Sequence, residues 1–239
     1  WSRNAPRCLS DLTGRAPLFA HLGTLEGKQV LDLGCGEGYC ARNYLRLGAA
    51  SVHGVDISAE MINLARANTS DPRASFERAS IAEFAAQQEA HAGRYDVVTA
   101  VFVSNYLDSD ELATMIRLAH ACLKNGGEFV MLHPHPHLPY HRQSASAGLQ
   151  FEVDESASYF DSIGDSHVGR IVDLEGKTIE VRLVHHTLEE LFGNVIGAGL
   201  RIDRFRELRL DKPTADGWPA LADVSLQTPL HIMISSTRD

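Results

Sequence analysis

Two aspartates and a set of glycines stand at a spacing that suits the binding of a nucleoside. Asp32 lies in an apolar run, VLDL, and Gly34, Gly36 and Gly38 follow at alternate positions. Glycines there let the backbone turn sharply and approach a ligand closely, because no Cβ is in the way. Asp56 comes twenty residues after Gly36, about the spacing at which a βαβ nucleotide site offers a carboxylate to ribose hydroxyls. The alternative is that Asp56 only caps a loop.

Strands and helices must hold these residues at one edge of a sheet. Val30, Leu31 and Leu33 predict a buried strand, and the residues after Gly38 predict a helix whose positive N-terminus faces the loop. Further strands are expected at 51–56, at 74–77, in the nearly continuous apolar run 97–103 and at 128–133. Helices are expected between them. This alternation predicts an α/β fold with a parallel sheet and right-handed crossovers.

The pattern changes after the fifth expected strand. The segment HPHPHLPYHRQSASAG is rich in histidine and proline and cannot continue a strand or helix. HVGRIVDL and KTIEVRLVHH, joined through Glu175 and Gly176, predict a β-hairpin, and Thr187 begins a capped helix. Two more strands, LRIDRFREL and LHIMISST, follow. We therefore divide a single domain into a helical cap (1–26), a cofactor-binding core (27–136), a lid insertion (137–186) that overhangs the sheet edge, and the C-terminal part of the sheet (187–239).

Composition narrows the range of partners. The chain has 239 residues, 44% hydrophobic, with a net charge of −9 and a pI near 5.7. This balance argues against nucleic acid, which needs clustered Lys and Arg. The arginines between 201 and 209 alternate with acids and are expected on a solvated strand face. Four cysteines without a CxxC pair favour a reduced, cytoplasmic protein, and no apolar run approaches the ~20 residues that cross a bilayer. Because the sequence starts at Trp1, a cleaved targeting segment stays an open alternative.

Several segments together resemble the motifs of the class I S-adenosylmethionine-dependent methyltransferases. VLDLGCGEGYCAR is similar to the first motif, GVDIS followed by Met61 to the second, and RYDVVTAVFVSNYL to the fourth. LKNGGEFVM resembles the element that leads into the fifth strand. The similarity covers about Gln29 to His133. It implies a Rossmann-like, seven-stranded, mostly parallel sheet whose last strand is antiparallel.

The resemblance also implies roles for individual residues. The glycines would approach the methionine part of S-adenosylmethionine, Asp32 would lie near its amino group, and Asp56 would bind both ribose hydroxyls. Other residues would surround the adenine, where Ser80 stands in place of an Asp that many members use to hold the adenine amino group. The complete predicted cofactor set is Asp32, Gly34, Cys35, Gly36, Gly38, Asp56, Ile57, Met61, Ser80, Ile81 and Val101.

Methyl transfer is a displacement at carbon, and it depends mainly on holding the acceptor in line in a dry pocket. A general base is needed only if the acceptor loses a proton. Our candidates for base or substrate orientation are His133, His186 and Tyr106, chosen because histidine has a suitable pKa and all three positions fall near the ligand edge. The alternative for each histidine is that it only shapes the pocket. We expect no metal site in the HPHPH run, because the prolines spoil strand geometry.

The main hypothesis is a methyltransferase that acts on a nitrogen or oxygen, or else a carbon, of a small-molecule metabolite or natural product, with S-adenosylhomocysteine as the product. The N-terminal and lid segments resemble bacterial small-metabolite methyltransferases, including an azapteridine-type N-methyltransferase. One alternative is a regulator or partner subunit that binds the cofactor without turnover. Another is an NAD oxidoreductase, although G-C-G-E-G lacks the dinucleotide register. We expect no membrane or nucleic-acid partner, and a monomer or homodimer.

Overall fold

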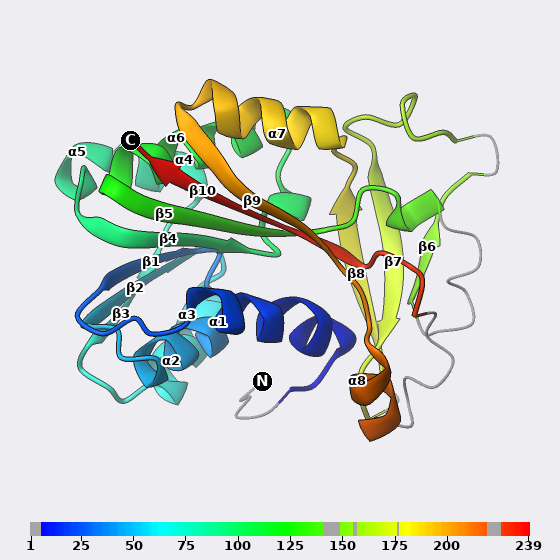
Figure 1. The fold of residues 1–239 in the computed structure, drawn as a ribbon, viewed down its shortest axis with the longest axis horizontal. Coiled ribbons are helices and arrows are strands. Elements are labelled where there is room, and N and C mark those ends of the chain that lie inside the picture. Colours follow the sequence, from blue (N-terminus) through cyan, green and yellow to red (C-terminus); the bar gives the residue numbers. More distant parts are fainter. Residues whose placement is uncertain (1–5, 141–148, 155–156, 176, 219–225) are drawn as a thin grey trace.

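A seven-stranded sheet forms the centre of the computed structural model, which describes residues 6–140, 149–154, 157–175, 177–218 and 226–239 (Figure 1). Its strand order is β3-β2-β1-β4-β5-β10-β9. The first five strands are parallel, and β10 runs antiparallel to both of its neighbours. The predicted α/β fold with a mostly parallel seven-stranded sheet is therefore confirmed. The strands are β1 (Gln29–Leu33), β2 (Ser51–Asp56), β3 (Ala74–Arg78), β4 (Tyr95–Val101), β5 (Leu123–Pro134), β9 (Leu200–Leu208) and β10 (His231–Arg238).

Helices cover both faces of this sheet and give it two apolar cores (Figure 1). Alternate residues of β5 show the division. Phe129 and Met131 pack with α6 and α7, whereas Val130 and Leu132 pack with α1 and α2. The helices are α2 (Tyr39–Arg46), α3 (Ala59–Asn68), α4 (Ile81–Ala85), α5 (Gln88–His91), α6 (Ser109–Cys122) and α7 (Leu188–Gly197).

Side-chain caps begin four of these helices at the positions that the sequence indicates. Ser58 accepts a hydrogen bond from Met61 N, and Thr187 from Glu190 N. Ser80 and Asp108 each form a reciprocal capping box with the glutamate three residues later. Because α3, α4 and α6 follow parallel strands directly, their caps fix where the connecting turns end, at the carboxyl edge of the sheet.

The N-terminal cap consists of a π-helical turn, η1 (Asp11–Arg15), that continues into α1 (Ala16–Leu22). Leu18 and Leu22 are buried in the same core as Tyr44 of α2. Gly14 of η1 lies against Phe102, just after the end of β4, and so places η1 beside the carboxyl end of that strand.

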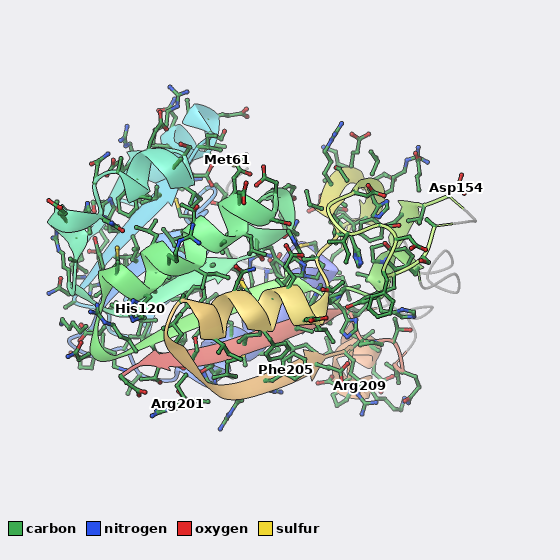
Figure 2. All side chains as sticks on the ribbon, turned by 90° about the horizontal axis from the view of Figure 1, so that it is seen from above. Met61, His120, Asp154, Arg201, Phe205 and Arg209 are labelled. Carbon is green, nitrogen blue, oxygen red and sulfur yellow. The ribbon has the colours of Figure 1, made fainter. Side chains whose placement is uncertain are left out.

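A second, three-stranded antiparallel sheet stands beside that same edge (Figure 1). It contains β6 (Leu149–Glu152), β7 (Ser166–Val172) and β8 (Thr178–Val184). The β7–β8 pair matches the expected hairpin, whereas β6 and a short 3-10 helix, η3 (Leu138–Tyr140), were not predicted. Gly176 of the expected turn lies outside the described residues. Figure 2 shows Asp154 in this small-sheet region, away from Met61 in the main body.

Two boundaries differ from the sequence expectation. The helix α6 ends at Cys122, before Asn125, because the backbone becomes extended at Leu123 and β5 starts there. A short helix, α8 (Lys212–Gly217), replaces an expected loop. Asp211 caps it by accepting from Thr214 N at 2.8 Å, and a proline stands in its first turn. These two signals are visible in the sequence and could have predicted the helix.

The outer strand β9 carries the alternating charges noted in the sequence. Arg201 pairs with Asp203 and Asp239 on the exposed surface, and Figure 2 shows Arg201, Phe205 and Arg209 along this edge. Within the described part of the chain, no helix is both long and apolar enough to cross a bilayer.

Candidate functional site

A cavity of about 570 Å³ lies at the carboxyl ends of β1, β2 and β4. All the predicted cofactor residues except Gly38 line it. So does Tyr106, one of the three predicted catalytic residues. Ligands of open parallel sheets bind at this edge. Residues that the sequence reasoning did not select also line it, among them Arg15, Glu37, Tyr39, Cys40, Val103, Phe102, Leu107 and Glu111.

The glycine loop is closed by backbone hydrogen bonds to the neighbouring strand. Gly34 N and Cys35 N both donate to the carbonyl oxygen of Val55, at 2.8 and 3.0 Å. Gly34 has φ +72°, and a Cβ added there would lie 2.5 Å from the Cβ of Val103. The residue must therefore be glycine for both conformational and steric reasons.

Gly38 is the one predicted cofactor residue that does not line the cavity. It is the residue before α2, with φ +81°. A Cβ there would lie 3.2–3.3 Å from Phe76, Ala65 and Arg42. Its neighbours in the structure are those of the packing at the start of α2.

Asp56 both orders the loop and retains room for a ligand. One carboxylate oxygen accepts from Gly36 N at 2.8 Å, and the other accepts from Ser58 N at 2.9 Å. Each oxygen has a second lone pair. The loop-capping alternative therefore describes part of what Asp56 does, and two acceptor positions are still available for a diol.

Asp32 is held in the interior with one oxygen unoccupied. In the sheet it lies between Gly54 of β2 and Thr99 of β4. Thr99 Oγ1 donates to Oδ1 at 2.8 Å, and the Tyr44 hydroxyl donates to Thr99 at 3.1 Å. Oδ2 is buried and has no hydrogen-bond partner among the described residues. Burial raises the pKa of Asp32 to about 7, against the opposing effects of the Thr99 hydrogen bond and Arg15.

Arg15 supplies a positive charge to the same cavity. Its Nη1 donates to Asp11 at 2.9 Å and to Ser10 at 3.2 Å, and its guanidinium lies 4.9 Å from the ring centroid of Phe102. Its Nε is buried without a partner in the described structure. No local motif marked this arginine, because its position depends on how η1 packs against the end of β4.

The residues predicted to surround the adenine all line the same cavity. Ile57 is 66% exposed, and Ile81 is partly buried. Ser80 lines the cavity, but its Oγ accepts from Glu83 N at 3.1 Å as the helix cap. A second hydrogen bond from this hydroxyl is still chemically allowed.

Of the three candidate catalytic residues, His133 and His186 lie side by side, with ring centroids 5.8 Å apart, and only Tyr106 lines the cavity. Tyr106, in the short helix η2 (Ser104–Tyr106), is half exposed and reaches the cavity. His133 and His186 are fully buried and do not line it. His133 Nδ1 forms a 2.8 Å hydrogen bond with Ser104 Oγ, and its Nε2 has no partner in the described structure. Burial and then neighbouring histidines, His186 foremost, hold the pKa of His133 well below its usual range.

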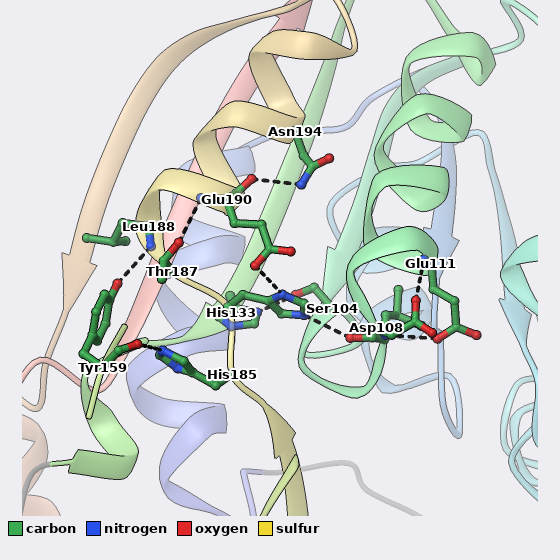
Figure 3. A network of polar contacts seen from close by, with 12 residues as sticks. Ser104, Asp108, Glu111, His133, Tyr159, His185, Thr187, Leu188, Glu190 and Asn194 are labelled. Carbon is green, nitrogen blue, oxygen red and sulfur yellow. Dashed lines mark hydrogen bonds and ion pairs between the residues drawn. The ribbon is translucent and has the colours of Figure 1, made fainter. Parts of the chain in front are cut away.

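His186 links α7 to the segment before α6, and Figure 3 shows Glu190 of α7 and Asp108 at the start of α6 in this region. Its Nε2 donates to the carbonyl oxygen of Leu107 at 2.9 Å, and its Nδ1 lies 3.0 Å from Glu190 Oε2. Since Leu107 lines the cavity, this histidine supports the wall from outside.

The HPHPH run does not converge on one point. His133 faces Ser104, whereas His135 Nε2 lies 3.0 Å from Glu207 Oε1. Across the described ranges, no group of three or more His, Cys, Asp or Glu side chains is arranged to hold a metal ion.

A glycine loop after β1, a carboxylate at the end of β2 and an antiparallel β10 define the class I methyltransferase fold. Comparison with known proteins agrees. Residues 30–127 match the family described as a methyltransferase domain. The chain therefore has the fold of the class I S-adenosylmethionine-dependent methyltransferases.

The individual relatives either match only part of this chain or share low sequence identity with it. An uncharacterized protein of Haemophilus influenzae is 30% identical over 146 residues, which cover 59% of this chain and 56% of that protein. A ubiquinone biosynthesis O-methyltransferase of Acinetobacter baylyi is 33% identical over 110 residues, covering 45% of this chain and 44% of the enzyme. The chain thus spans about half the length of the curated relatives it matches. The crystal structure of an S-adenosylmethionine-dependent methyltransferase from Mesorhizobium loti superimposes with a TM-score of 0.67 at 23% identity, covering 93% of this chain and 96% of that one.

Proposed function

We propose that the protein transfers the methyl group of S-adenosylmethionine to an oxygen or nitrogen atom of a small molecule. The observation that carries the proposal is the pair of opposite charges, Asp32 and Arg15, in the cavity that also contains Asp56. The amino-acid end of the cofactor has an ammonium and a carboxylate, and its ribose has two hydroxyls. These groups match an unpaired carboxylate oxygen, a guanidinium with an unpaired N–H, and two free acceptor positions.

The cofactor, when bound, supplies an activated methyl group on a sulfonium, and the chain's residues contribute binding and orientation. Asp32 is fixed by Thr99, which leaves only Oδ2 for an ammonium. Gly34 lets the backbone approach without a side chain. Preorganised groups of this kind spend little free energy on reorganisation during the reaction.

The acceptor is expected beside Tyr106, which lines the cavity at the end of β4 next to the small sheet. The overall charge of −9 supports a small molecule over a nucleic acid. The names of several curated relatives specify O-methyl transfer in ubiquinone biosynthesis, which supports oxygen as the first atom to test here.

His133 and His186 are proposed as positioning residues. His186 acts through Leu107 and His133 through Ser104, both in the loop that carries Tyr106. A base is not required if the acceptor is already deprotonated or is an uncharged amine. We assign Tyr106 alone to direct acceptor contact.

Calorimetry and turnover would test the proposed function. The protein is expected to bind S-adenosylhomocysteine with 1:1 stoichiometry and not to bind NAD. Incubation with S-adenosylmethionine and panels of phenols, hydroxy acids and amines should then release S-adenosylhomocysteine with one acceptor class. Saturable binding without turnover across acceptors would favour the cofactor-binding regulator, and preferential NAD binding would refute the proposal.

A further inference from the structure

A π-helical turn, η1, ends at Arg15 and places this residue at the cavity. The segment Asp11–Arg15 is a π-helix, a rare conformation that is frequent at functional sites. Asp11 lies inside this turn, 1% exposed, and accepts from the backbone N–H groups of Arg7 and Cys8 as well as from Arg15. The carboxylate therefore fixes the turn and one side of the guanidinium together.

The ring of Phe102 contacts the other side of the Arg15 guanidinium, and the backbone of Phe102 has a left-handed conformation that is unfavourable for this residue type. Its φ of +56° is the one positive value among the described non-glycine residues. In a regular strand, Phe102 would share the face of Val98 and Ala100. Instead its ring packs with the core that contains Val101, and Val103 packs on the opposite face. The left-handed backbone turns the ring towards the N-terminal cap.

The ring fills a slot with little room to spare. Its face lies 4.9 Å from the Arg15 guanidinium carbon, and the His231 ring meets it at 4.8 Å and 67°. A Cβ at Gly14 would lie 2.6 Å from Phe102 Cζ. A larger residue at position 14 would therefore push η1 away from the sheet. Burial and then Arg15 lower the pKa of His231 to about 3, so a neutral ring stands beside the cation.

These contacts restrict Arg15 without using all its donors. A guanidinium has five N–H groups in a fixed plane. Nη1 bonds to Asp11 and Ser10, and the Cys40 side chain also contacts the guanidinium, while Nε is buried and unpaired among the described residues. An aromatic face holds a guanidinium in orientation without consuming a donor. The arrangement thus leaves directed N–H groups for an anionic ligand.

We propose that Phe102 is a positioning residue that sets Arg15 to bind the α-carboxylate of the cofactor. Phe102, held by its left-handed backbone and by the space at Gly14, thereby makes the cavity select nucleosides with an amino-acid end over those without one. The inference rests on the proposed function, since it assumes that the cavity takes S-adenosylmethionine and its product.

Two related ligands separate this role from a general structural one. S-adenosylhomocysteine carries the amino-acid end, and 5′-methylthioadenosine lacks it. The variant Phe102→Leu should raise the Kd of S-adenosylhomocysteine about tenfold, the range of a partly desolvated cation–π contact. Its Kd for 5′-methylthioadenosine should stay within about twofold, because no contact with Arg15 is lost there. Arg15→Gln should weaken only the first ligand, and Phe102→Leu should add nothing to that loss in the double variant.

Phe102→Gly is the second variant, because it removes the ring while relieving the backbone. It should lower the Tm, because the loss of the packed ring outweighs the relieved backbone strain, and it should show the same selective loss of S-adenosylhomocysteine affinity. Equal weakening of both ligands by Phe102→Leu, or additive losses in the double variant, would overturn the positioning role while leaving the proposed function intact. Failure of the unmodified protein to bind either ligand would instead refute the proposed function, and the inference with it.

Discussion

Asp32 should make the ligand-free protein less stable at neutral pH than it would be with a neutral side chain. Its pKa is raised from 3.8 to about 7 by burial. Between these two values the folded state holds a proton that the unfolded state has lost. The stability due to this group is therefore complete below pH 3.8 and declines as the pH rises to about 7.

The size of the effect follows from the shift. At ~1.36 kcal/mol per pKa unit, the difference in Asp32 ionisation between the folded and unfolded states lowers the free energy of unfolding by about 4 kcal/mol at pH 8 and by about 2 kcal/mol at pH 5. Asp32→Asn removes the titration and keeps an oxygen to accept from Thr99. We expect the variant to exceed the unmodified protein in stability by these amounts, with the gain larger at pH 8.

Urea unfolding at pH 5, 6.5 and 8, monitored by circular dichroism, measures the difference. Glu111→Gln is the matched control, because it removes a carboxylate from an exposed position on the same cavity while the glutamine oxygen can still accept from Asp108 N in the capping box, and it should change stability by less than about 1 kcal/mol. A gain that does not depend on pH, or a loss at pH 8, would refute the reasoning.

The same carboxylate should make ligand binding depend on pH in the opposite sense. An ammonium binds the ionised form, so the affinity of the unmodified protein for S-adenosylhomocysteine should fall as the pH drops below about 7, approaching tenfold per pH unit. Asp32→Asn should bind at least tenfold more weakly at pH 8 and show little pH dependence. Stability gained together with binding lost is the pattern of a strained functional group.

Three further outcomes are expected. Gly34→Ala should lower the free energy of unfolding by more than about 2 kcal/mol in urea titrations and abolish S-adenosylhomocysteine binding, because the added Cβ meets Val103. Gly36→Ala has open space around the added Cβ and should lose only about 1–2 kcal/mol, because of its positive φ. Equal losses in the two variants would contradict the steric argument. Tyr44→Phe removes the hydroxyl that donates to Thr99 and should lower the free energy of unfolding by about 1 kcal/mol in the same titrations, while S-adenosylhomocysteine affinity stays within about twofold. A large loss of affinity would contradict this and show that the hydrogen bonds from Tyr44 through Thr99 to Asp32 affect the ligand. Cys122, which is buried and does not line the cavity, should react with a thiol reagent only after unfolding, since burial raises its pKa to about 12. Rapid reaction of Cys122 in the native protein, located by peptide mass mapping, would contradict this.

The amino-acid sequence alone predicted the fold class, because the residues that indicate this class lie close together along the chain. The glycines, Asp32 and Asp56 act through backbone geometry and strand ends that are encoded within about 25 residues. The capped starts at Ser58, Ser80 and Asp108 are likewise local hydrogen bonds. For such features, residue type and spacing are enough to predict the fold and the position of the cofactor cavity.

The tertiary structure decided which side chains reach that cavity. His133 lies near the end of β5 and His186 lies between β8 and α7, yet packing turns them towards Ser104, Leu107 and Glu190. Arg15 stood in no recognisable motif, and it reaches the cavity only because η1 packs on the end of β4.

The orientation of the Phe102 ring shows why sequence patterns do not predict which side chains reach the cavity. Alternation along β4 predicts one face for its ring, and a left-handed φ gives it the other. Contacts with segments about ninety residues earlier and more than a hundred residues later hold that conformation. Non-local packing of this kind leaves no periodic or local signal in the sequence.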